Sequence, residues 1–367
     1  MSDLAGYLRD FYEKAHEEND ERRLRLCRLM GGEAFALRET DPARALALYD
    51  EGSRLAAALG EPVWVFVFDE RRLTAQMHFL RDYRHAFHLA VKSVLEIRKS
   101  KFDGLDGLRH DFHFHLIDAY IGIDPFGYSK EIREALVHLD AALAPEDESR
   151  YQLSATWWDF ALATDDLEAT ERHALAAVAR GEADPSKRKL IHWGTFAYDC
   201  LCFVSFRRGA WKELGERGAV GEELARKVGH KLELAGLHMW QALAALHMGD
   251  MATARRLYRQ SVVGVSRLRM PPEPKYFDAM CAFLESEGNV DGQLAARDRE
   301  LATLTDKGRI DAESRCRLQR CRLLARLGRP AQAEQAAARE VAKKLRDPAP
   351  RLAELEAVAR DQTGPRT

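Results

Sequence analysis

Small and apolar residues recur along this chain at spacings of four and three, with charged residues between them. In HMGDMATARRLYRQSV, Gly249 ends one helical run, and Ala254, Tyr258 and Ser261 then follow at those spacings. Residues spaced in this way lie on one face of an α-helix, so the segment predicts an amphipathic helix with that face buried. Two helices can approach closely at the small residues, while the tyrosine ring fills the space beside them.

This spacing occurs in eight helical segments, including the one above, and each is preceded by another apolar run. Its first positions are residues 45, 86, 135, 169, 214, 254, 293 and 333, and its weakest copy is the one with Gln293 and Arg297. Turn signals such as Gly60-Glu61-Pro62 and Asp184-Pro185-Ser186 separate the runs. VWVFVF could be a strand, but helix-favouring residues follow it, so we predict a helix. Because a single hairpin cannot bury its apolar face, we expect neighbouring hairpins to stack.

This pattern resembles the second-helix signature of the tetratricopeptide repeat. The best match is Gly249, Ala254, Tyr258 and Ser261, with Ala242 in the small-residue position of the first helix. The resemblance covers roughly residues 20 to 345. Its period is about 40 residues instead of the usual 34, similar to the long repeats of bacterial signalling regulators.

The resemblance implies an all-α, right-handed solenoid of about eight hairpins. We expect a cap segment at 1–20, the solenoid at 21–346, a capping helix at 347–362 and a disordered tail at 363–367. Leu4, Leu8 and Phe11 are expected to pack on the first hairpin.

Composition supports a folded chain with a sizeable core. Of the 367 residues, 46% are hydrophobic and 31% charged, with a net charge of −2, and disorder needs lower hydrophobicity and higher net charge. The region 307–351 is locally basic, which indicates either solvated helix faces or an interaction surface. The chain contains no apolar run of 18 residues and no apolar signal core, so we expect a cytoplasmic protein whose six cysteines are buried, small apolar residues.

Candidate catalytic groups do not form a recognisable motif. His110, His113 and His115 lie together in RHDFHFH, but HExxH and paired CxxC motifs are absent, so we expect no metal site. His192 and Cys200 are two helical turns apart, too far for a catalytic hydrogen bond. We therefore expect neither an enzyme nor a cofactor.

Three glycines in GERGAVGEE lie three residues apart. No strand precedes Gly215, Gly218 and Gly221, and no Lys-Ser/Thr follows them, so they do not form a phosphate-binding loop. Glycines at this spacing share one helix face and permit close crossing of helices, while they weaken the helix itself by about 1 kcal/mol each relative to alanine.

In tetratricopeptide-like arrays the first helix of each hairpin lines a concave groove. Transferring the groove-facing positions to this sequence gives a set of aromatic and charged residues suited to holding a peptide. The set is Phe68, Arg71, His78, Tyr151, Ser154, Trp158, Phe196, Asp199, Phe203, Phe206, Met239, Leu243, Lys275, Asp278, Arg315 and Arg322. The alternative for each aromatic residue is an ordinary place in the core between helices.

Three functions are compatible with these features. A scaffold or regulatory adaptor would bind a peptide or a domain of another protein. A peptide-sensing receptor would share the fold but normally carries an output domain. Binding of nucleic acid would use the basic C-terminal third, although the arginines there surround the helix and no aromatic residues accompany them.

Overall fold

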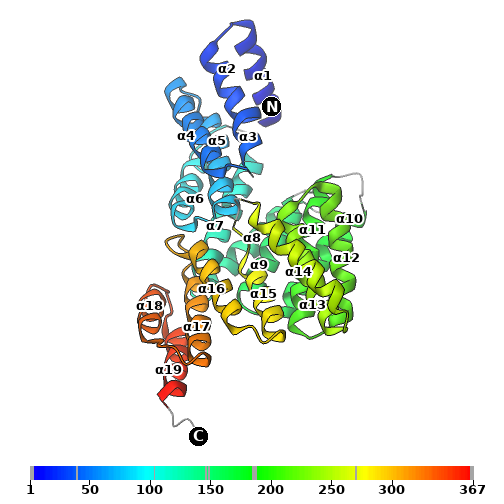
Figure 1. Ribbon diagram of the computed structural model, residues 1–367. Coiled ribbons are helices and arrows are strands. Elements are labelled where there is room, and N and C mark those ends of the chain that lie inside the picture. Colours follow the sequence, from blue (N-terminus) through cyan, green and yellow to red (C-terminus); the bar gives the residue numbers. More distant parts are fainter. Residues whose placement is uncertain are drawn as a thin grey trace. The chain divides into compact units, whose positions relative to one another are not determined.

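A computed structural model describes residues 4–38, 40–102, 104–144, 147, 149–183, 188–268 and 271–363, with the backbone alone for 183, 188–192 and 361–363. The described part consists of helices joined by turns, and consecutive helices pack against each other (Figure 1). The prediction of an all-α fold is confirmed, and so is the helix in which VWVFVF lies. The Asp184-Pro185-Ser186 turn and residues 364–367 of the predicted tail lie outside the described residues.

The chain divides into two compact units, the first running to Tyr120 and the second starting at Ile121. The first unit holds a cap helix and two helical hairpins, and then most of a further helix that continues into the second unit. Its elements are α1 (Leu4–Glu17), α2 (Glu21–Arg28), the π-helical segment η1 (Leu29–Glu33), α3 (Ala34–Leu37), α4 (Pro42–Leu59), α5 (Pro62–Thr74), the π-helical segment η2 (Ala75–Phe79), α6 (Tyr83–Ile97) and α7 (Asp106–Ile123).

Aromatic residues form the core of the first unit. The Phe11 ring of α1 lies 4.9 Å from that of Trp64 in α5, and Trp64 packs in turn on Phe68. Gly52 of α4 lies so close to the Phe68 ring that a Cβ atom would overlap with it. Gly52 of α4 therefore makes room for the Phe68 ring of α5.

The second unit contains the remaining helices in hairpin order. They are α8 (Ser129–Ala142), α9 (Ser149–Ala163), α10 (Leu167–Ala183), α11 (Arg188–Arg207), α12 (Trp211–Val228), α13 (Lys231–His247), α14 (Met251–Ser266), α15 (Pro274–Ser286), α16 (Val290–Leu304), α17 (Ile310–Arg326), α18 (Gln332–Ala342) and α19 (Ala349–Thr363). The last helix, α19, packs on α17 and α18 and corresponds to the predicted capping helix 347–362. None of the helices in the described part of the chain is both long and apolar enough to cross a membrane.

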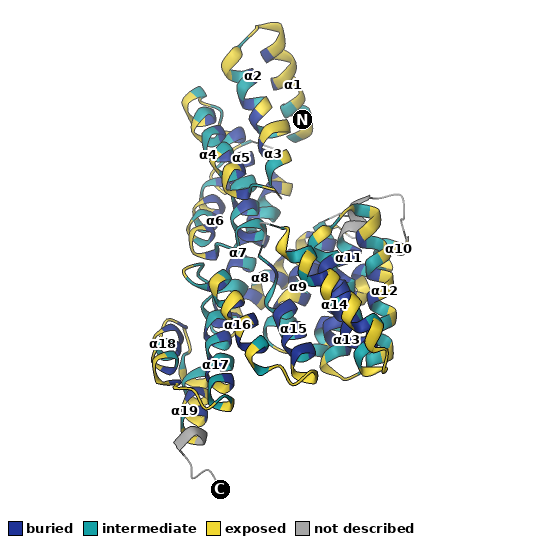
Figure 2. Cartoon of the chain, in the orientation of Figure 1, coloured by how far each residue is buried: buried dark blue, intermediate teal, exposed yellow. Residues whose placement is uncertain are grey.

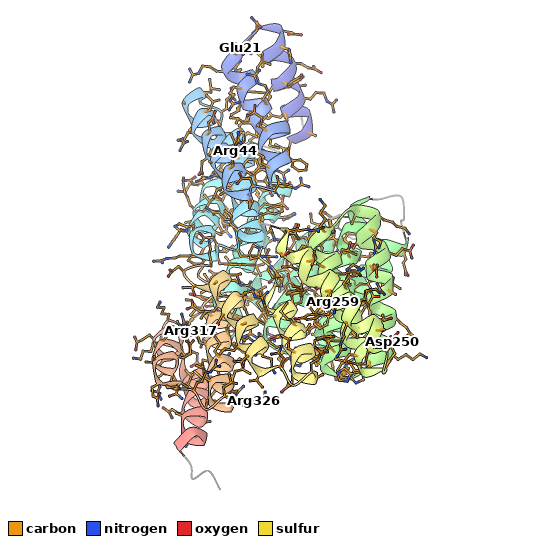
Figure 3. All side chains as sticks on the ribbon, in the orientation of Figure 1. Glu21, Arg44, Asp250, Arg259, Arg317 and Arg326 are labelled. Atoms are coloured by element: carbon orange, nitrogen blue, oxygen red, sulfur yellow. The ribbon has the colours of Figure 1, made fainter. Side chains whose placement is uncertain are left out.

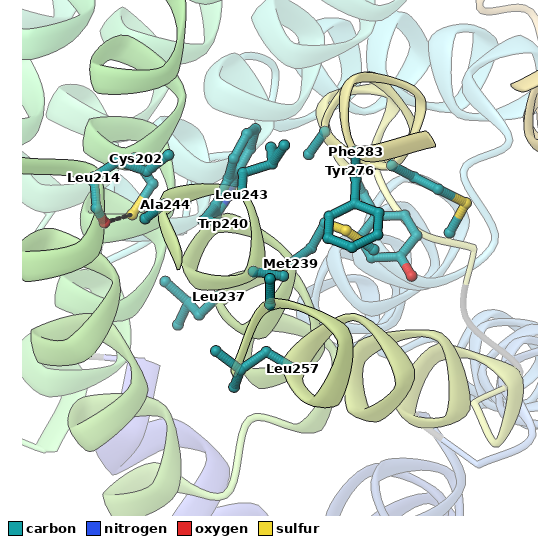
Figure 4. Close-up of a cluster of buried hydrophobic side chains, with 14 of the residues drawn as sticks. Cys202, Leu214, Leu237, Met239, Trp240, Leu243, Ala244, Leu257, Tyr276 and Phe283 are labelled. Atoms are coloured by element: carbon teal, nitrogen blue, oxygen red, sulfur yellow. Dashed lines mark hydrogen bonds between the residues drawn. The ribbon is translucent and has the colours of Figure 1, made fainter. Parts of the chain in front are cut away.

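The apolar core of the second unit runs through several hairpins. Met239, Trp240 and Leu243 of α13 lie at its centre, with Leu257 of α14 and Phe283 of α15 packed around them (Figure 4). The buried stripe of each helix faces its neighbours (Figure 2), while charged side chains occupy exposed positions on the outside (Figure 3).

The repeated spacing reappears as a pattern of burial in the second helix of each hairpin. In α4, α6, α8, α10, α12, α14, α16 and α18, a first position and the residues four and seven further on are buried, except that Tyr258 is half-buried. The first positions are Ala45, Ala86, Ile132, Thr170, Leu214, Ala254, Gln293 and Ala331. The predicted starts at 135, 169 and 333 do not lie on the buried faces. In α10 and α18 alanines occupy both faces, so the pattern alone does not distinguish them, whereas in α8 the buried face consists of Ile132, Leu136 and Leu139 and carries no alanine.

The weakest copy of the spacing is buried as well. Gln293, Arg297 and Glu300 of α16 are each at most 5% exposed. The Arg297 guanidinium donates to Glu300 Oε2 at 2.5 Å and to Asp278 Oδ1 at 2.6 Å. An ionic network therefore takes the place of the small residues at this helix contact, and its polar side chains explain why the sequence matched the pattern poorly.

Turn residues set the helix boundaries where the sequence predicts them. Gly249 follows α13 with a φ of 87°, a left-handed conformation that favours glycine. Asp250 then accepts a hydrogen bond from the backbone N–H of Thr253 and so caps α14, and Asp41 and Asp166 cap α4 and α10 in the same way.

The glycines of α12 permit the predicted close contact. Gly218 and Gly221 are buried, and a Cβ atom on Gly221 would lie 2.7 Å from Leu237 Cδ2 and 3.0 Å from Tyr198 Cβ. Gly215 is different, because its nearest neighbour would be Ala244 Cβ at an ordinary 3.5 Å. Only two of the three glycines are therefore required by packing.

One contact in the second unit joins segments that are far apart in sequence. The buried Asp124 carboxylate accepts hydrogen bonds from the backbone N–H groups of Gly127 at 2.9 Å and Arg346 at 2.8 Å. The Arg346 side chain reaches Glu131 and lies over the Tyr128 ring. In an array whose repeats contact only their neighbours these turns would not meet, so this contact is additional to the packing of successive hairpins.

Candidate functional site

The sequence predicts that a partner binds along the first helix of each hairpin, and in the second unit these helices form one face. Helices α9, α11, α13 and α15 pack on one another in this order, in addition to packing on their hairpin partners. We call the surface along these four helices the first-helix face.

Most of the aromatic and apolar residues predicted to line a groove are core residues. Phe68, Tyr151, Ser154, Trp158, Phe203, Met239 and Leu243 are at most 8% exposed. A side chain buried to this extent does not contact a partner in this conformation, so for these residues the groove prediction is corrected. The physical reason is that neighbouring first helices approach closely enough for their facing side chains to fill the space between them.

Two of the predicted charged residues are brought together. Lys275 Nζ of α15 lies 2.6 Å from Asp199 Oδ2 of α11, and the indole N–H of Trp240 in α13 donates to Asp199 Oδ1 at 2.7 Å. The Asp199–Lys275 pair lies beside Gly236 of α13, where a Cβ atom would be 3.6 Å from the Asp199 carboxylate. Burial opposes the charge on Lys275, but Asp199, Cys200 and Asp159 raise its pKa well above the ordinary value. The ammonium group therefore stays charged at physiological pH.

The accessible part of the first-helix face is acidic and partly aromatic. Asp159 of α9 is exposed, Asp278 of α15 is partly exposed, and Phe206 at the end of α11 is half-buried against Trp240. Phe196 is also half-buried, with its ring 5.5 Å from that of His230. These side chains, not the buried ones, can meet another molecule.

The predicted residues of α17 lie apart from this set. Arg315 is partly exposed and pairs with Asp311 at 3.0 Å, and Arg322 is exposed. Ion pairs largely neutralise the locally basic region around them. Arg317 and Arg320 share Glu334 within that region, while Arg320, Arg326 and Arg329 reach Asp298, Glu285 and Asp291 outside it. Solvated helix faces therefore explain the local positive charge better than a strip of unpaired cations does.

The predicted residues of the first unit belong to a different cluster. Arg71 is partly exposed and pairs with Glu70 at 3.3 Å. His78 lies in η2, with its ring centre 6.0 Å from that of His115 in α7. In the sequence His115 stands out only with its neighbours in RHDFHFH, and no local signal connects it with a residue of another helix.

The electrostatics of this cluster centre on Glu70 and His115. Burial alone would raise the pKa of Glu70, but His115 and Arg71 lower it to about 2. Burial lowers the pKa of His115, and the neighbouring Glu70, Asp118 and Asp111 carboxylates outweigh this effect, so that its pKa lies above the ordinary value. Without another ligand, the two side chains therefore form a buried ion pair.

The cysteines are poor nucleophiles. Burial raises the pKa of Cys200 to about 12 and that of Cys281 and Cys321 to about 11, and the pKa values of Cys27, Cys202 and Cys316 are also raised. Because the thiolate is the reactive form, these side chains behave as small apolar residues. Five of them are buried as the sequence predicts, and Cys27 is half-buried. The side chain of His192 lies outside the described residues.

Comparison with known proteins adds no relative. No protein-family model matches the chain, and no curated protein is significantly similar to it.

Proposed function

We propose that the chain is a non-catalytic scaffold or regulatory adaptor, built from tetratricopeptide-like hairpins, that binds a peptide or domain of another protein on its first-helix face. The observation that carries the proposal is the ordered packing of α9, α11, α13 and α15 on one another. This arrangement gives a continuous surface made of four helices, with rigid aromatic residues beside charged ones. The right-handed array of about eight hairpins is part of the proposal.

The charges of this face indicate which kind of segment it would bind. Asp159 is exposed on this face, and Asp278, which pairs with Arg297, is partly exposed, while Lys275 pairs with Asp199. A partner segment with lysine or arginine beside an apolar side chain would complement the carboxylates and cover Phe206. The pairing of the C-terminal arginines gives less support to nucleic-acid binding than to a protein partner.

The test is affinity purification of the intact protein from its native cells, followed by quantitative mass spectrometry. Asp159→Lys reverses a charge on the first-helix face, and Glu216→Lys makes the same change at an exposed position on α12. We expect a stoichiometric partner with the unaltered protein and with Glu216→Lys, and at least a tenfold lower recovery with Asp159→Lys. The absence of a stoichiometric partner, or equal recovery with both variants, would contradict the proposal.

A further inference from the structure

One buried histidine in the first unit has an unmet requirement for hydrogen bonds. His115 is 3% exposed, and neither Nδ1 nor Nε2 has a hydrogen-bond partner among the described residues. The nearest carboxylate oxygen, Oε1 of Glu70, is 3.6 Å from Nε2, which is long for a hydrogen bond. Folded proteins rarely leave a buried polar group in this condition, and a bound ion can satisfy it where no protein atom does.

The residues around His115 are those that bind transition metals. One ligand atom each from His78, His115 and Asp118 lie within 4.8 Å of one another, and Glu70 Oε1 lies 3.6 Å from His115 Nε2. Two imidazoles with carboxylates are a common ligand set for zinc. Magnesium and calcium prefer sites made of oxygen ligands alone.

The local backbone explains how these side chains meet. His115 and Asp118 are three residues apart on α7, so they share one helix face. Glu70 and Thr74 share a face of α5, and His78 lies in the π-helical segment η2 that follows α5. Short π-helical segments are frequent at functional sites, where the extra residue in a turn changes which way a side chain points.

The Glu70 carboxylate is itself held in place. The Thr74 hydroxyl donates to Glu70 Oε1 at 2.9 Å, and Arg71 lies 3.3 Å from Oε2. Partners of this kind orient metal-binding carboxylates and tune their affinity. The site thus has a candidate set of ligands and also the supporting interactions that such sites use.

We propose that His78, His115 and Asp118, with Glu70 as a fourth ligand, bind a divalent transition-metal ion, zinc being the best match, which links α5 and η2 to α7. Ligand atoms around one zinc ion lie about 3–4 Å apart, because each bond is about 2 Å long. Binding therefore draws the ligand atoms closer together, and two of the four ligands, His78 and Asp118, are half-buried. This role is independent of any partner on the first-helix face.

Metal binding is measured on the full-length protein, free of any histidine tag and treated with a chelator. Zinc chloride is titrated in a calorimeter, and cobalt chloride is added separately to record the visible absorption of the bound ion. We expect one zinc ion per chain with a micromolar or tighter Kd, and a cobalt spectrum typical of four ligands. Magnesium chloride is expected to give no heat of binding.

Variants assign the ligands. Asp118→Asn and His78→Ala change half-buried residues, and each is expected to weaken zinc binding at least 100-fold. Changing a residue that only supports a metal ligand typically weakens binding by about 10- to 100-fold. His110→Gln, which alters a histidine of the same helix outside the cluster, is expected to bind zinc as tightly as the unaltered protein. Circular dichroism confirms that each variant is folded.

The proposal is overturned if the unaltered protein binds no zinc, or if Asp118→Asn and His78→Ala both bind it normally. A heat of binding that also disappears in His110→Gln would assign the ion to another group of ligands and would equally refute this site.

Discussion

Two buried ionic clusters, one in each unit, differ in how completely their polar atoms are satisfied. In the second unit both oxygens of Asp199 have partners, one the Lys275 ammonium and the other the Trp240 indole. In the first unit neither ring nitrogen of His115 has a hydrogen-bond partner among the described residues, although carboxylates surround it. Burial of charge alone therefore does not mark a binding site. The satisfied cluster holds three helices together, whereas the unsatisfied one has the features of a ligand site.

The largest effect is expected from breaking the satisfied cluster. Asp199→Ala leaves the Lys275 ammonium buried without its direct ion-pair partner, and we expect the free energy of unfolding to fall by about 3–5 kcal/mol. Urea denaturation followed by circular dichroism measures it. The double variant Asp199→Leu, Lys275→Met removes both charges and is expected to recover most of the loss. If Asp199→Ala costs less than about 1 kcal/mol, the pair is not a structural link.

A second satisfied carboxylate tests whether this conclusion extends across the second unit. Asp124→Ala removes the hydrogen bonds to the backbone of Gly127 and Arg346, and we expect a loss of about 2–3 kcal/mol. Arg346→Ala keeps those bonds and removes the half-exposed ion pair with Glu131 and the contact with the Tyr128 ring, so it should cost clearly less than Asp124→Ala. Equal losses in the two variants, measured by urea denaturation, would contradict the role given to Asp124.

Glycine substitutions compare these polar effects with a purely steric one. Gly221→Ala places a Cβ atom against Leu237 and Tyr198 and is expected to destabilise the protein by about 1–3 kcal/mol. Gly215→Ala meets only ordinary contacts and is expected to stabilise α12 by up to about 1 kcal/mol. Thermal denaturation of both variants shows whether each substitution raises or lowers the stability of the protein. A stabilising Gly221→Ala would show that the helices are less tightly packed than described.

The smallest expected effect is a difference in pH dependence between the clusters in zinc-free protein. The raised pKa of His115 gives stability that is present below about 6.5 and is lost as the pH rises through its folded value, while the lowered pKa of Glu70 gives stability that is lost as the pH falls from 4.5 towards 2. Besides Glu70, the groups facing His115 are Asp118, Asp111 and His78. The first-unit pair therefore stabilises most between about pH 4.5 and 6.5.

Hydrogen exchange at pH 6 and pH 8, corrected for the intrinsic rates, measures this difference in each unit. We expect α5 and α7 to lose protection at the higher pH, whereas α11 and α13 keep theirs because the pKa of Lys275 is raised. The same change in both units would mean that the Glu70–His115 pair does not set the stability of its unit.

The sequence predicted the helices and much of their packing, because apolar and small residues are spaced according to helix geometry. It placed the buried faces of α4, α6, α12 and α14 correctly. Where alanines lie all round a helix, as in α10 and α18, composition does not tell which face is buried. Where an ionic network replaces small residues, as at Arg297, the pattern is lost although the burial remains.

The candidate sites were less predictable, because they depend on how closely different helices approach. The residues predicted to line a groove include many that the tight approach of the helices buries, among them most of the aromatic and apolar ones. The pairing of Asp199 with Lys275 and of His78 with His115 joins residues of different hairpins. No local spacing in a single sequence carries that information.

The contrast between the clusters is tested most directly by crystals of the protein grown with zinc, with diffraction recorded on both sides of the zinc absorption edge. We expect an anomalous difference peak enclosed by His78, His115, Asp118 and Glu70, and none beside Asp199 and Lys275. A well-ordered first unit without such a peak, or a peak beside the Asp199–Lys275 pair, would contradict the account.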